Sequence, residues 1–560
     1  MMPIPRECDT DVSRYFLQEL KSISHKTNGD AGEILIANRD WTFPGYPTVH
    51  LVDGIWENFP DLGRTHSWLV HQFKFVQPLI AYDRLNRSTA GARAALTLAH
   101  NWWSKYQFNV GDKSEMAWHD HATAIRLVNL LLLRAHLVSV DVQEDLSQDM
   151  LLSHAHLLAK ESFHTTENNH GLDQSLALFK ASFELGLPEY TDIAVERVRD
   201  HISKAFVDDG GHIENSPNYQ EFGLNQALRA SRVSYSYLGH DRLGLPDTML
   251  AKATLVLAHM ILPSGKLPII GDSPMRVAKS NFGDRKPSTF PAYEYATSSG
   301  RDGRPPADTD LVLPTSGWAI FRQHWKPDDF CQAVHIIMKW GHLSSAHRHD
   351  DDLSLTVFGF GEQWVSDAGQ FKYQEDDPVR IYCRSSRGHS IPQVSAVAAA
   401  RQLRDYAAPP KILSWELNSE ASCVSAETSM FPGFKMKRLV KYDRPTNTIR
   451  IQDTCSPDSE ESWEWVKRRA GNGLSTYETR FLIPVDKTLR VEPGKGVLIG
   501  GKTRTMRIAT SMSVKVLLAQ VEEPISGWRS EVNGVIEPAY DVTFWTSAEE
   551  YDGIFEINWH

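Results

Sequence analysis

The first half of the chain carries apolar residues at helical spacing. Between residues 121 and 140, Ile125, Val128, Leu132, Ala135 and Val138 recur every three or four positions, which places them on one face of a helix. Similar segments follow one another with short polar turns between them. The expected helices are Gly91–Tyr106, His121–Val140, Met150–Phe163, Leu172–Leu185, Thr191–Phe206, Phe222–Gly239 and Thr248–Leu262. Successive helices of similar length predict an α/α bundle, solenoid or toroid.

Beyond about residue 310 the period becomes two. In the segment Leu353–Phe358, leucine and valine alternate with serine and threonine, which is typical of a strand. The other expected strands are Ala333–Trp340, Thr448–Asp453, Val497–Gly500 and Ser513–Leu518. The stretch Arg285–Asp310 is rich in Pro, Gly, Ser and Arg and predicts a linker or long irregular connection. We therefore expect a multidomain α+β protein, with a helical domain at residues 1–300 and an antiparallel β-sandwich at residues 301–560.

Composition narrows the class of protein. Hydrophobic residues make up 41% of the 560 residues and charged residues 23%, which excludes a largely disordered chain. Acidic residues (70) outnumber basic residues (59), so the formal net charge is −11 and we expect no nucleic-acid partner. The five cysteines are scattered and contain no CxxC pair, which argues against a disulfide scaffold or a thiolate zinc site.

No segment predicts a membrane or export signal. The N-terminus, Met1 to Cys8, lacks the basic and apolar regions of a secretory signal. The most apolar stretch, Leu127 to Leu133, is too short to span a bilayer and is flanked by arginines. We expect a soluble protein without a membrane partner, cytoplasmic by default, with periplasmic or secreted locations left open.

The strongest candidate for chemistry is a run of histidines and aspartates at residues 345–352. His347 and His349 would share one face of a strand, and three aspartates follow them. Asp367 and His389 lie downstream, at intervals that allow adjacent strands to carry them. Two imidazoles and a carboxylate suit zinc or a similar divalent metal. The alternatives are a polar cluster at a strand edge and a histidine network without a metal.

Two further groups of polar residues lie near expected helix starts. Asn169 and His170 open the helix that contains Gln174; the asparagine could cap that helix, or the pair could face a carboxylate. His119 comes just before another expected helix, and Arg126 lies within it. For this second group the alternative is a solvated helix face.

A loop at residues 209–219 carries a third group. It contains Glu214 and Asn215, continues with Ser-Pro-Asn and ends at Tyr219. Ser-Pro-Asn is ordinary turn chemistry, and a tyrosine by itself is more often a packing residue.

Taken together, these segments resemble the heparinase II/III-like polysaccharide lyases, which include related alginate and glycosaminoglycan lyases. The resemblance rests on Asn169-His170-Gly171, Glu214-Asn215-Ser216-Pro217 with Tyr219, His347-Arg348-His349, and Asp367 followed by Arg384 and His389. The motifs occur in the same order and in the same two domain types. The family implies an (α/α) toroid or incomplete barrel, then an antiparallel β-sandwich, with the active site between them.

The resemblance also implies a reaction, β-elimination beside a uronic acid. Asn169 and His170 would neutralise the uronate carboxylate, which makes the C5 proton removable. Tyr219 would protonate the departing oxygen and could also act as base, and His347 would be the base for the other uronate epimer.

The remaining site residues are also implied by the resemblance. The expected substrate contacts are His119, Arg126, Gln174, Glu214, Asn215 and Arg384. His349, Asp367 and His389 match the metal ligands of metal-containing members, with zinc expected first and manganese or calcium as alternatives. No organic cofactor is expected. The choice between Tyr373 and Tyr382 as an additional tyrosine stays open.

The predicted substrate is an acidic polysaccharide or oligosaccharide. Glycosaminoglycans such as heparan sulfate, chondroitin or hyaluronan come first and alginate next, and a homo-oligomer is left open. One alternative is a glycoside hydrolase on an α/α toroid, with Asp120 and Glu214 as its two carboxylates. The other is a non-catalytic polysaccharide-binding protein.

Overall fold

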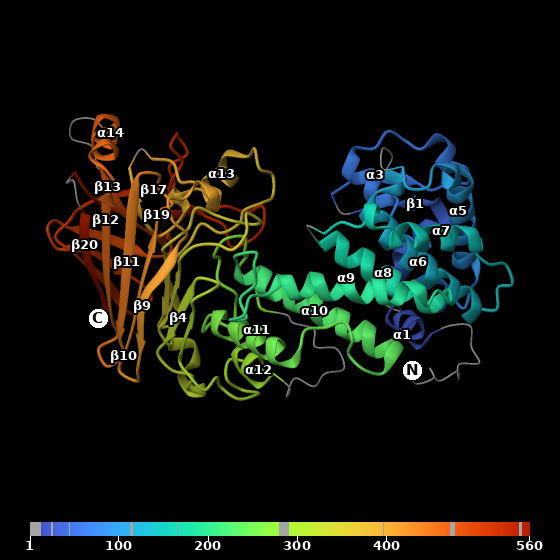
Figure 1. Ribbon diagram of the computed structural model, residues 1–560, viewed down its shortest axis with the longest axis horizontal. Helices are drawn as coiled ribbons and strands as arrows, with labels where there is room; N and C mark the ends of the chain where they lie inside the picture. The colour runs from blue at the N-terminus through green and yellow to red at the C-terminus, as the bar shows by residue number, and fades with distance from the viewer. Residues whose placement is uncertain are drawn as a thin grey trace. The chain divides into compact units, whose positions relative to one another are not determined.

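The computed structural model describes residues 13–23, 26–43, 45–112, 116–166, 169–278, 290–395, 397–470, 476–547 and 551–560. The chain forms two compact units (Figure 1). We call residues 1–203 with 227–245 the helical unit, and residues 204–226 with 246–560 the sheet unit. The division passes through one long helix, α10 (Pro217–Leu238). A domain boundary at residue 300 stays a prediction.

The helical unit is built from antiparallel helices joined by short connections. Its helices are α1 (Arg14–Ser22), α2 (Lys26–Asn38), α3 (Arg64–Val70), α4 (Val76–Asn86), α5 (Ala90–Tyr106), α6 (Asp120–Ser139), α7 (Gln148–Ala159), α8 (Asn169–Glu184), α9 (Glu189–Ala205) and the second half of α10. The small strands β1 (Asp40–Trp41) and β2 (Val49–His50) pair with each other. Every helix expected in this part of the sequence is present, with ends shifted by a few residues.

Helix α6 is the central helix of this unit. Leu127, Leu130 and Leu133 on it have no exposed surface. By length and composition it could cross a membrane, but 72% of its most apolar window is buried inside the protein, as in the core helix of a globular domain.

The sheet unit contains three larger antiparallel sheets. Their strand orders are β14-β15-β16-β20-β12-β11-β10-β9, β17-β19-β13-β8 with β18 beside β19, and β3-β4-β5-β6-β7. The strands are β3 (Asp310–Leu313), β4 (Trp318–Arg322), β5 (His335–Lys339), β6 (Ser354–Gly359), β7 (Glu362–Val365), β8 (Pro392–Val394), β9 (Lys411–Leu417), β10 (Ala421–Thr428), β11 (Phe434–Asp443), β12 (Thr448–Pro457), β13 (Tyr477–Pro484), β14 (Thr488–Glu492), β15 (Gly496–Gly500), β16 (Thr505–Ala509), β17 (Ser513–Leu518), β18 (Trp528–Arg529), β19 (Glu537–Thr546) and β20 (Tyr551–Trp559). Helices α11 (Asp247–Met260), α12 (Pro291–Thr297), α13 (Pro378–Arg384) and α14 (Glu460–Ala470) complete the unit.

One hydrophobic core joins the sheets. Met436 and Phe555 of the eight-stranded sheet, Phe481 and Phe544 of the second sheet and Leu355 of the third belong to a single buried cluster. Side chains from facing sheets meeting in one core make this part of the chain a β-sandwich.

One expectation for this unit was wrong in part, and one was confirmed. The stretch expected to be a linker contains helix α12, because Pro291 suits the first turn of a helix and Tyr293 and Tyr295 bury their rings; its first part, residues 285–289, lies outside the described residues. The strand expected at Leu353–Phe358 is confirmed as β6, which pairs with β5 and β7 and has buried side chains on both faces of the sheet.

A second expectation was wrong, because His347 and His349 are not on a strand. They lie in the loop between β5 and β6, and His347 adopts a positive φ of 53°. This left-handed conformation interrupts an extended backbone.

Candidate active site

The start of helix α10 fixes Tyr219 in the sheet unit. The Ser216 hydroxyl accepts a hydrogen bond from the Tyr219 backbone N–H at 3.3 Å, and Pro217 is the first helical residue. Serine followed by proline is a favourable helix start, because the hydroxyl satisfies a free N–H and proline has none to satisfy. Tyr219 is therefore set in the first turn of α10.

Two side chains, from His347 and Tyr373, contact the Tyr219 side chain. His347 stacks on it, with ring centroids 3.8 Å apart and an interplanar angle of 22°. The hydroxyl oxygens of Tyr219 and Tyr373 are 3.0 Å apart. Burial raises the pKa of Tyr219, and the Tyr373 hydroxyl raises it further, so the phenol is held in its protonated form.

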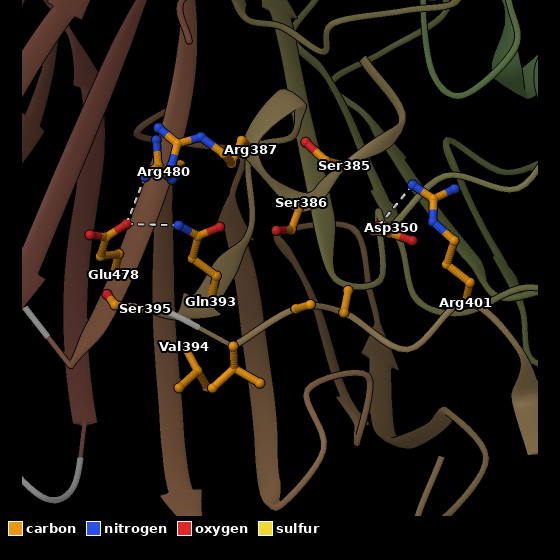
Figure 2. A pocket seen from close by; sticks show the side chains of 13 residues that line it. Asp350, Ser385, Ser386, Arg387, Gln393, Val394, Ser395, Arg401, Glu478 and Arg480 are labelled. Carbon is orange, nitrogen blue, oxygen red and sulfur yellow. Dashed lines mark hydrogen bonds and ion pairs between the residues drawn. The ribbon is translucent and has the colours of Figure 1, made fainter. Parts of the chain in front are cut away.

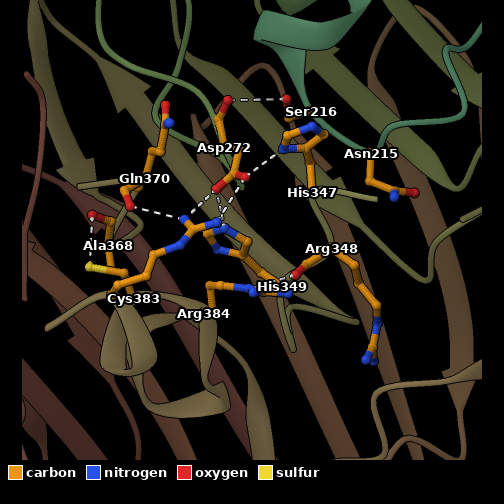
Figure 3. Close-up of polar contacts among 12 residues, drawn as sticks. Asn215, Ser216, Asp272, His347, Arg348, His349, Ala368, Gln370, Cys383 and Arg384 are labelled. Atoms are coloured by element: carbon orange, nitrogen blue, oxygen red, sulfur yellow. Dashed lines mark hydrogen bonds and ion pairs between the residues drawn. The ribbon is translucent and has the colours of Figure 1, made fainter. Parts of the chain in front are cut away.

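A buried carboxylate, Asp272, organises the histidines (Figure 3). It accepts hydrogen bonds from Nδ1 of His347 and Nε2 of His349, both at 2.8 Å. Arg380 donates to both of its oxygens, at 2.5 and 3.0 Å. Although burial opposes ionisation, these donors hold the pKa of Asp272 well below its usual range.

Asp272 also fixes the tautomers of both rings. A carboxylate only accepts, so the histidine nitrogen facing it carries the hydrogen. In neutral rings the other nitrogens, Nε2 of His347 and Nδ1 of His349, therefore have free lone pairs. His347 is thereby prepared to accept a proton at Nε2, which lies 3.6 Å from Oε2 of Glu214.

Glu214 and Asn215 have different surroundings. Burial raises the pKa of Glu214, and the nearby His347 only partly offsets this. Asn215 is almost fully buried and donates to the carbonyls of Ser344 and Ala346, both at 3.0 Å. The structure thus makes Asn215 an anchor of the loop that carries His347.

The three predicted metal ligands lie together. Candidate ligand atoms of His349, Asp367 and His389 are all within 4.8 Å of one another, and all three side chains are buried. Within the described residues, Nδ1 of His349 and Nε2 of His389 are buried without a hydrogen-bond partner. Unpaired buried nitrogens are costly, and two imidazoles with one carboxylate suit zinc, so these residues fit a divalent cation.

The helical unit holds a second cluster of histidines and carboxylates. His119 caps helix α6, and its Nδ1 lies 2.8 Å from Oδ1 of Asp120. Nδ1 of His170 is 3.4 Å from the same oxygen, and the Thr165 hydroxyl donates to Oδ2 at 2.5 Å. Burial opposes ionisation of Asp120, but these partners outweigh it and lower its pKa far below the usual value.

His121 connects this cluster to a second carboxylate. Its ring stacks on His170 at a centroid distance of 4.3 Å, and its Nε2 donates to Asp173 at 2.7 Å. Arg229 also pairs with Asp173. Asn169 is exposed at the start of α8, next to His170.

Two protein-family models match this chain. The family model described as "Heparinase II/III N-terminus" matches residues 9–295, and the one described as "Heparinase II/III-like, C-terminal" matches residues 305–552. The chain belongs to the heparinase II/III family. It is a polysaccharide lyase, as predicted, and membership in this family selects the lyase over the hydrolase and the binding protein.

Solved structures show the fold of this heparinase II/III family member. A heparinase III is similar with a TM-score of 0.78 and 15% identity, covering 99% of this chain and 87% of that one. The heparan sulfate lyase HepC from Pedobacter heparinus gives 0.71 and 15%, covering 98% and 87%. A chondroitinase AC lyase gives 0.51 and 8%, covering 97% and 82%. The predicted toroid followed by a β-sandwich is confirmed. A search of curated protein sequences finds no match.

Three predicted substrate contacts of the lyase have structural partners. Arg126 is fully buried, lies 4.0 Å from the Trp102 ring centroid and donates to His154 at 2.8 Å. Gln174 is buried and bonds to the backbone of Phe163 and Thr165, which holds the segment before α8. Arg384 pairs with Glu375 and donates to the Arg348 carbonyl at 3.3 Å. The first two therefore support the fold around the cluster.

Sequence reasoning missed Asp272, Asp173 and Arg229. Asp272 follows an apolar run in Pro-Ile-Ile-Gly-Asp-Ser, and a polar residue directly after such a run was the available signal. Of the two candidate tyrosines, Tyr373 contacts Tyr219, whereas Tyr382 is buried and donates to the Trp528 carbonyl at 3.0 Å.

Proposed function

We propose that this lyase cleaves a glycosaminoglycan of the heparan sulfate type by β-elimination at a uronic acid, leaving an unsaturated uronate. The observation that carries the proposal is the stacked Tyr219–His347 pair with Asp272 behind it, which supplies a protonated phenol and a free imidazole nitrogen side by side. The substrate class is supported by proteins that share this fold and are named heparinase III and heparan sulfate lyase.

His347 and Tyr219 divide the proton transfers. The Nε2 lone pair of His347 accepts the C5 proton when this proton lies on its side of the sugar, and Asp272 stabilises the resulting imidazolium. Tyr219, whose raised pKa keeps it protonated, donates to the departing O4. The electron pair of the C5–H bond forms the C4–C5 double bond as the C4–O4 bond breaks. For the other epimer, Tyr219 would act as base only in its tyrosinate form, which its raised pKa disfavours.

Asn169 and His170 neutralise the uronate carboxylate in this proposal. The C5 proton is weakly acidic because the adjacent carboxylate is negative, so hydrogen-bond donors to that carboxylate lower the barrier. Asn169 is exposed and His170 is held by Asp120, which leaves both able to meet a substrate anion.

Replacement of Tyr219 tests the reaction. We expect Tyr219→Phe to lower kcat by about 10²–10⁴-fold, because the ring remains while its proton is lost. The measurement is ultraviolet absorbance of the unsaturated uronate during incubation with heparan sulfate, chondroitin sulfate, hyaluronan and alginate. Tyr235→Phe, on the exposed side of the same helix, is the matched control and keeps wild-type activity. New reducing ends without absorbance would indicate a hydrolase instead.

We also propose that His349, Asp367 and His389 hold a divalent cation, with zinc first. A bound cation would supply positive charge that ties together the three loops bearing these residues. We expect chelation to lower the melting temperature of the wild type, because the two unpaired nitrogens and the carboxylate lose their shared partner. Readdition of zinc restores it. In His389→Gln the melting temperature no longer responds to the chelator. A wild-type protein whose melting and metal content are both unaffected by chelation would contradict the site.

A further inference from the structure

A cavity in the sheet unit is lined by residues that take no part in the proposed proton transfers. It has a volume of about 450 Å³, within the range of ordinary ligand sites. The backbone around it comes from the segment 385–387 after α13, from β8 and the residues that follow it, and from β13. We call it the arginine cavity, because Arg387, Arg401 and Arg480 line it (Figure 2).

Arg480 and Asp350 in the arginine cavity have partners of opposite charge, whereas Arg387 is bonded only to a backbone carbonyl among the described residues. Arg480 is neutralised by Glu478, at 2.7 Å, and by Asp541. Asp350 has two partners, Arg348 at 3.3 Å and Arg401 at 3.4 Å. Among the described residues Arg387 has no carboxylate partner, and its hydrogen bond runs from Nε to the Ile525 carbonyl at 3.4 Å.

Arg387 is therefore the unmatched positive charge of this cavity. It is half-buried, and Figure 2 shows its guanidinium beside that of Arg480. Glu478 and Asp541 act on Arg387 only at longer range, because both pair directly with Arg480, so a bound anion would supply the direct partner that Arg387 lacks. A guanidinium binds carboxylate and sulfate groups through two parallel hydrogen bonds.

The rest of the lining suits a sugar ring. Gln393 donates to Glu478 at 2.7 Å, and its oxygen is turned the other way, toward Ser386 (Figure 2). The Ser386 hydroxyl has no hydrogen-bond partner in the part of the chain that the structure describes. Val394 and Val397 add an apolar surface for the C–H faces of a sugar.

We propose that the arginine cavity is a second carbohydrate site, which binds an acidic sugar unit through Arg387 and is not lined by Tyr219 or His347. The choice of an acidic sugar rests on the proposed function. The site holds a chain of the substrate class at a position where no bond is cleaved. Its segment 385–387 directly precedes His389, so an occupied cavity also restrains the backbone that carries this predicted metal ligand.

Calorimetric binding of a heparan sulfate hexasaccharide tests the site. The full chain carries Tyr219→Phe, which slows cleavage, and is compared with the same chain carrying Arg387→Gln in addition. We expect about tenfold weaker binding when Arg387 is replaced, because a charge-assisted contact is lost. Arg404→Gln is the control, since Arg404 is an arginine of the same region with an 82% exposed side chain, and its affinity stays within about twofold. Equal affinity of the Arg387 and Arg404 variants would overturn the proposal.

A second variant covers the case in which Arg387→Gln disturbs folding. Ala398 lines the cavity and is exposed, so Ala398→Trp fills the space without touching a charge. It should weaken hexasaccharide binding to a similar degree at an unchanged melting temperature. Unweakened binding with the cavity filled would overturn the site.

Two further ligands identify what the site recognises. Inorganic sulfate should bind far more weakly than the hexasaccharide; the same Arg387-dependent affinity for both would mean a free-anion site and would overturn the sugar. Uncharged maltohexaose should not bind.

The absorbance assay on the wild type separates this inference from the proposed function. Binding that depends on Arg387 without any unsaturated product would refute the proposed lyase substrate and would still support the carbohydrate site in the arginine cavity. Product formation together with binding that does not depend on Arg387 would support the proposed lyase substrate and refute the carbohydrate site in the arginine cavity.

Discussion

The helical unit and the sheet unit both hold histidines against carboxylates, but the two clusters are built differently. The Asp272 side chain has no exposed surface and is bonded to two histidines and one arginine. The Asp120 side chain is 15% exposed, and its partner His170 is 28% exposed. A buried carboxylate fixes the direction of a lone pair, whereas a partly exposed one leaves its histidines able to meet a ligand. The first arrangement suits proton transfer and the second suits charge recognition.

Replacing Asp272 should have the largest effect. Asp272→Asn leaves the buried Arg380 with only the exposed Glu375, at 3.5 Å, as a counter-charge, and we expect unfolding free energy to fall by about 3–5 kcal/mol. His347 also loses the partner that stabilises its charged form, so kcat falls by about 10²–10⁴-fold at temperatures where the variant is folded. Urea denaturation and the absorbance assay measure the two effects. Asp376→Asn, at an exposed position of the same unit, is the control. Wild-type stability in Asp272→Asn would show that this carboxylate does not organise the cluster.

Replacing Asp120 should cost less. An amide at this position keeps part of the hydrogen bonding to Thr165 and His170, and nearby solvent compensates for the rest. We expect a loss of about 1–2 kcal/mol in unfolding free energy. If the cluster recognises substrate charge, KM rises more than kcat falls. Should Asp120→Asn prove more destabilising than Asp272→Asn, the contrast between the two clusters would be reversed.

The two clusters also differ in how far the sequence predicted them. The residues that act directly in the proposed reaction were found because they lie in short motifs, such as Asn169-His170 and His347-Arg348-His349. Asp272 was missed because it lies 75 positions from His347 and meets it only through the fold. Motifs identify residues that are near one another along the chain. Hydrogen bonds between distant residues produce no such local sequence pattern.

The fold was predictable for a similar reason. Helical spacing and two-residue alternation depend on one face of each element being buried, so they identified the helices and the strand Ser513–Leu518 from sequence alone. The strand β6 was also predicted correctly, although all its side chains are buried; the pattern failed where a left-handed residue interrupts the chain, as at His347. The predicted substrate-contact roles of Arg126 and Gln174 rested on the family resemblance, which does not reveal that these polar side chains are enclosed by the core.

A pair of histidines without carboxylates offers the smallest and sharpest test of the comparison. His259 and His335 are buried beside Arg322; burial and, to a lesser degree, the charge of Arg322 together lower the pKa of each to about 3. The unfolded chain titrates near the ordinary histidine value of about 6.5. Between these two pH values the unfolded state binds protons that the folded state does not, so stability falls as pH decreases from about 6.5 toward 3.

At pH 5 this linkage should cost the sheet unit about 1–2 kcal/mol of unfolding free energy per histidine, relative to pH 7.5. His335→Gln can still donate to the His259 carbonyl but does not titrate, so its stability should change less between the two pH values. His240→Gln, at an exposed position, should behave as the wild type. Urea denaturation at both pH values measures the difference. An unchanged pH dependence in His335→Gln would mean that the acid sensitivity arises elsewhere, and that burial without a carboxylate is not what separates this pair from the histidines held by Asp272.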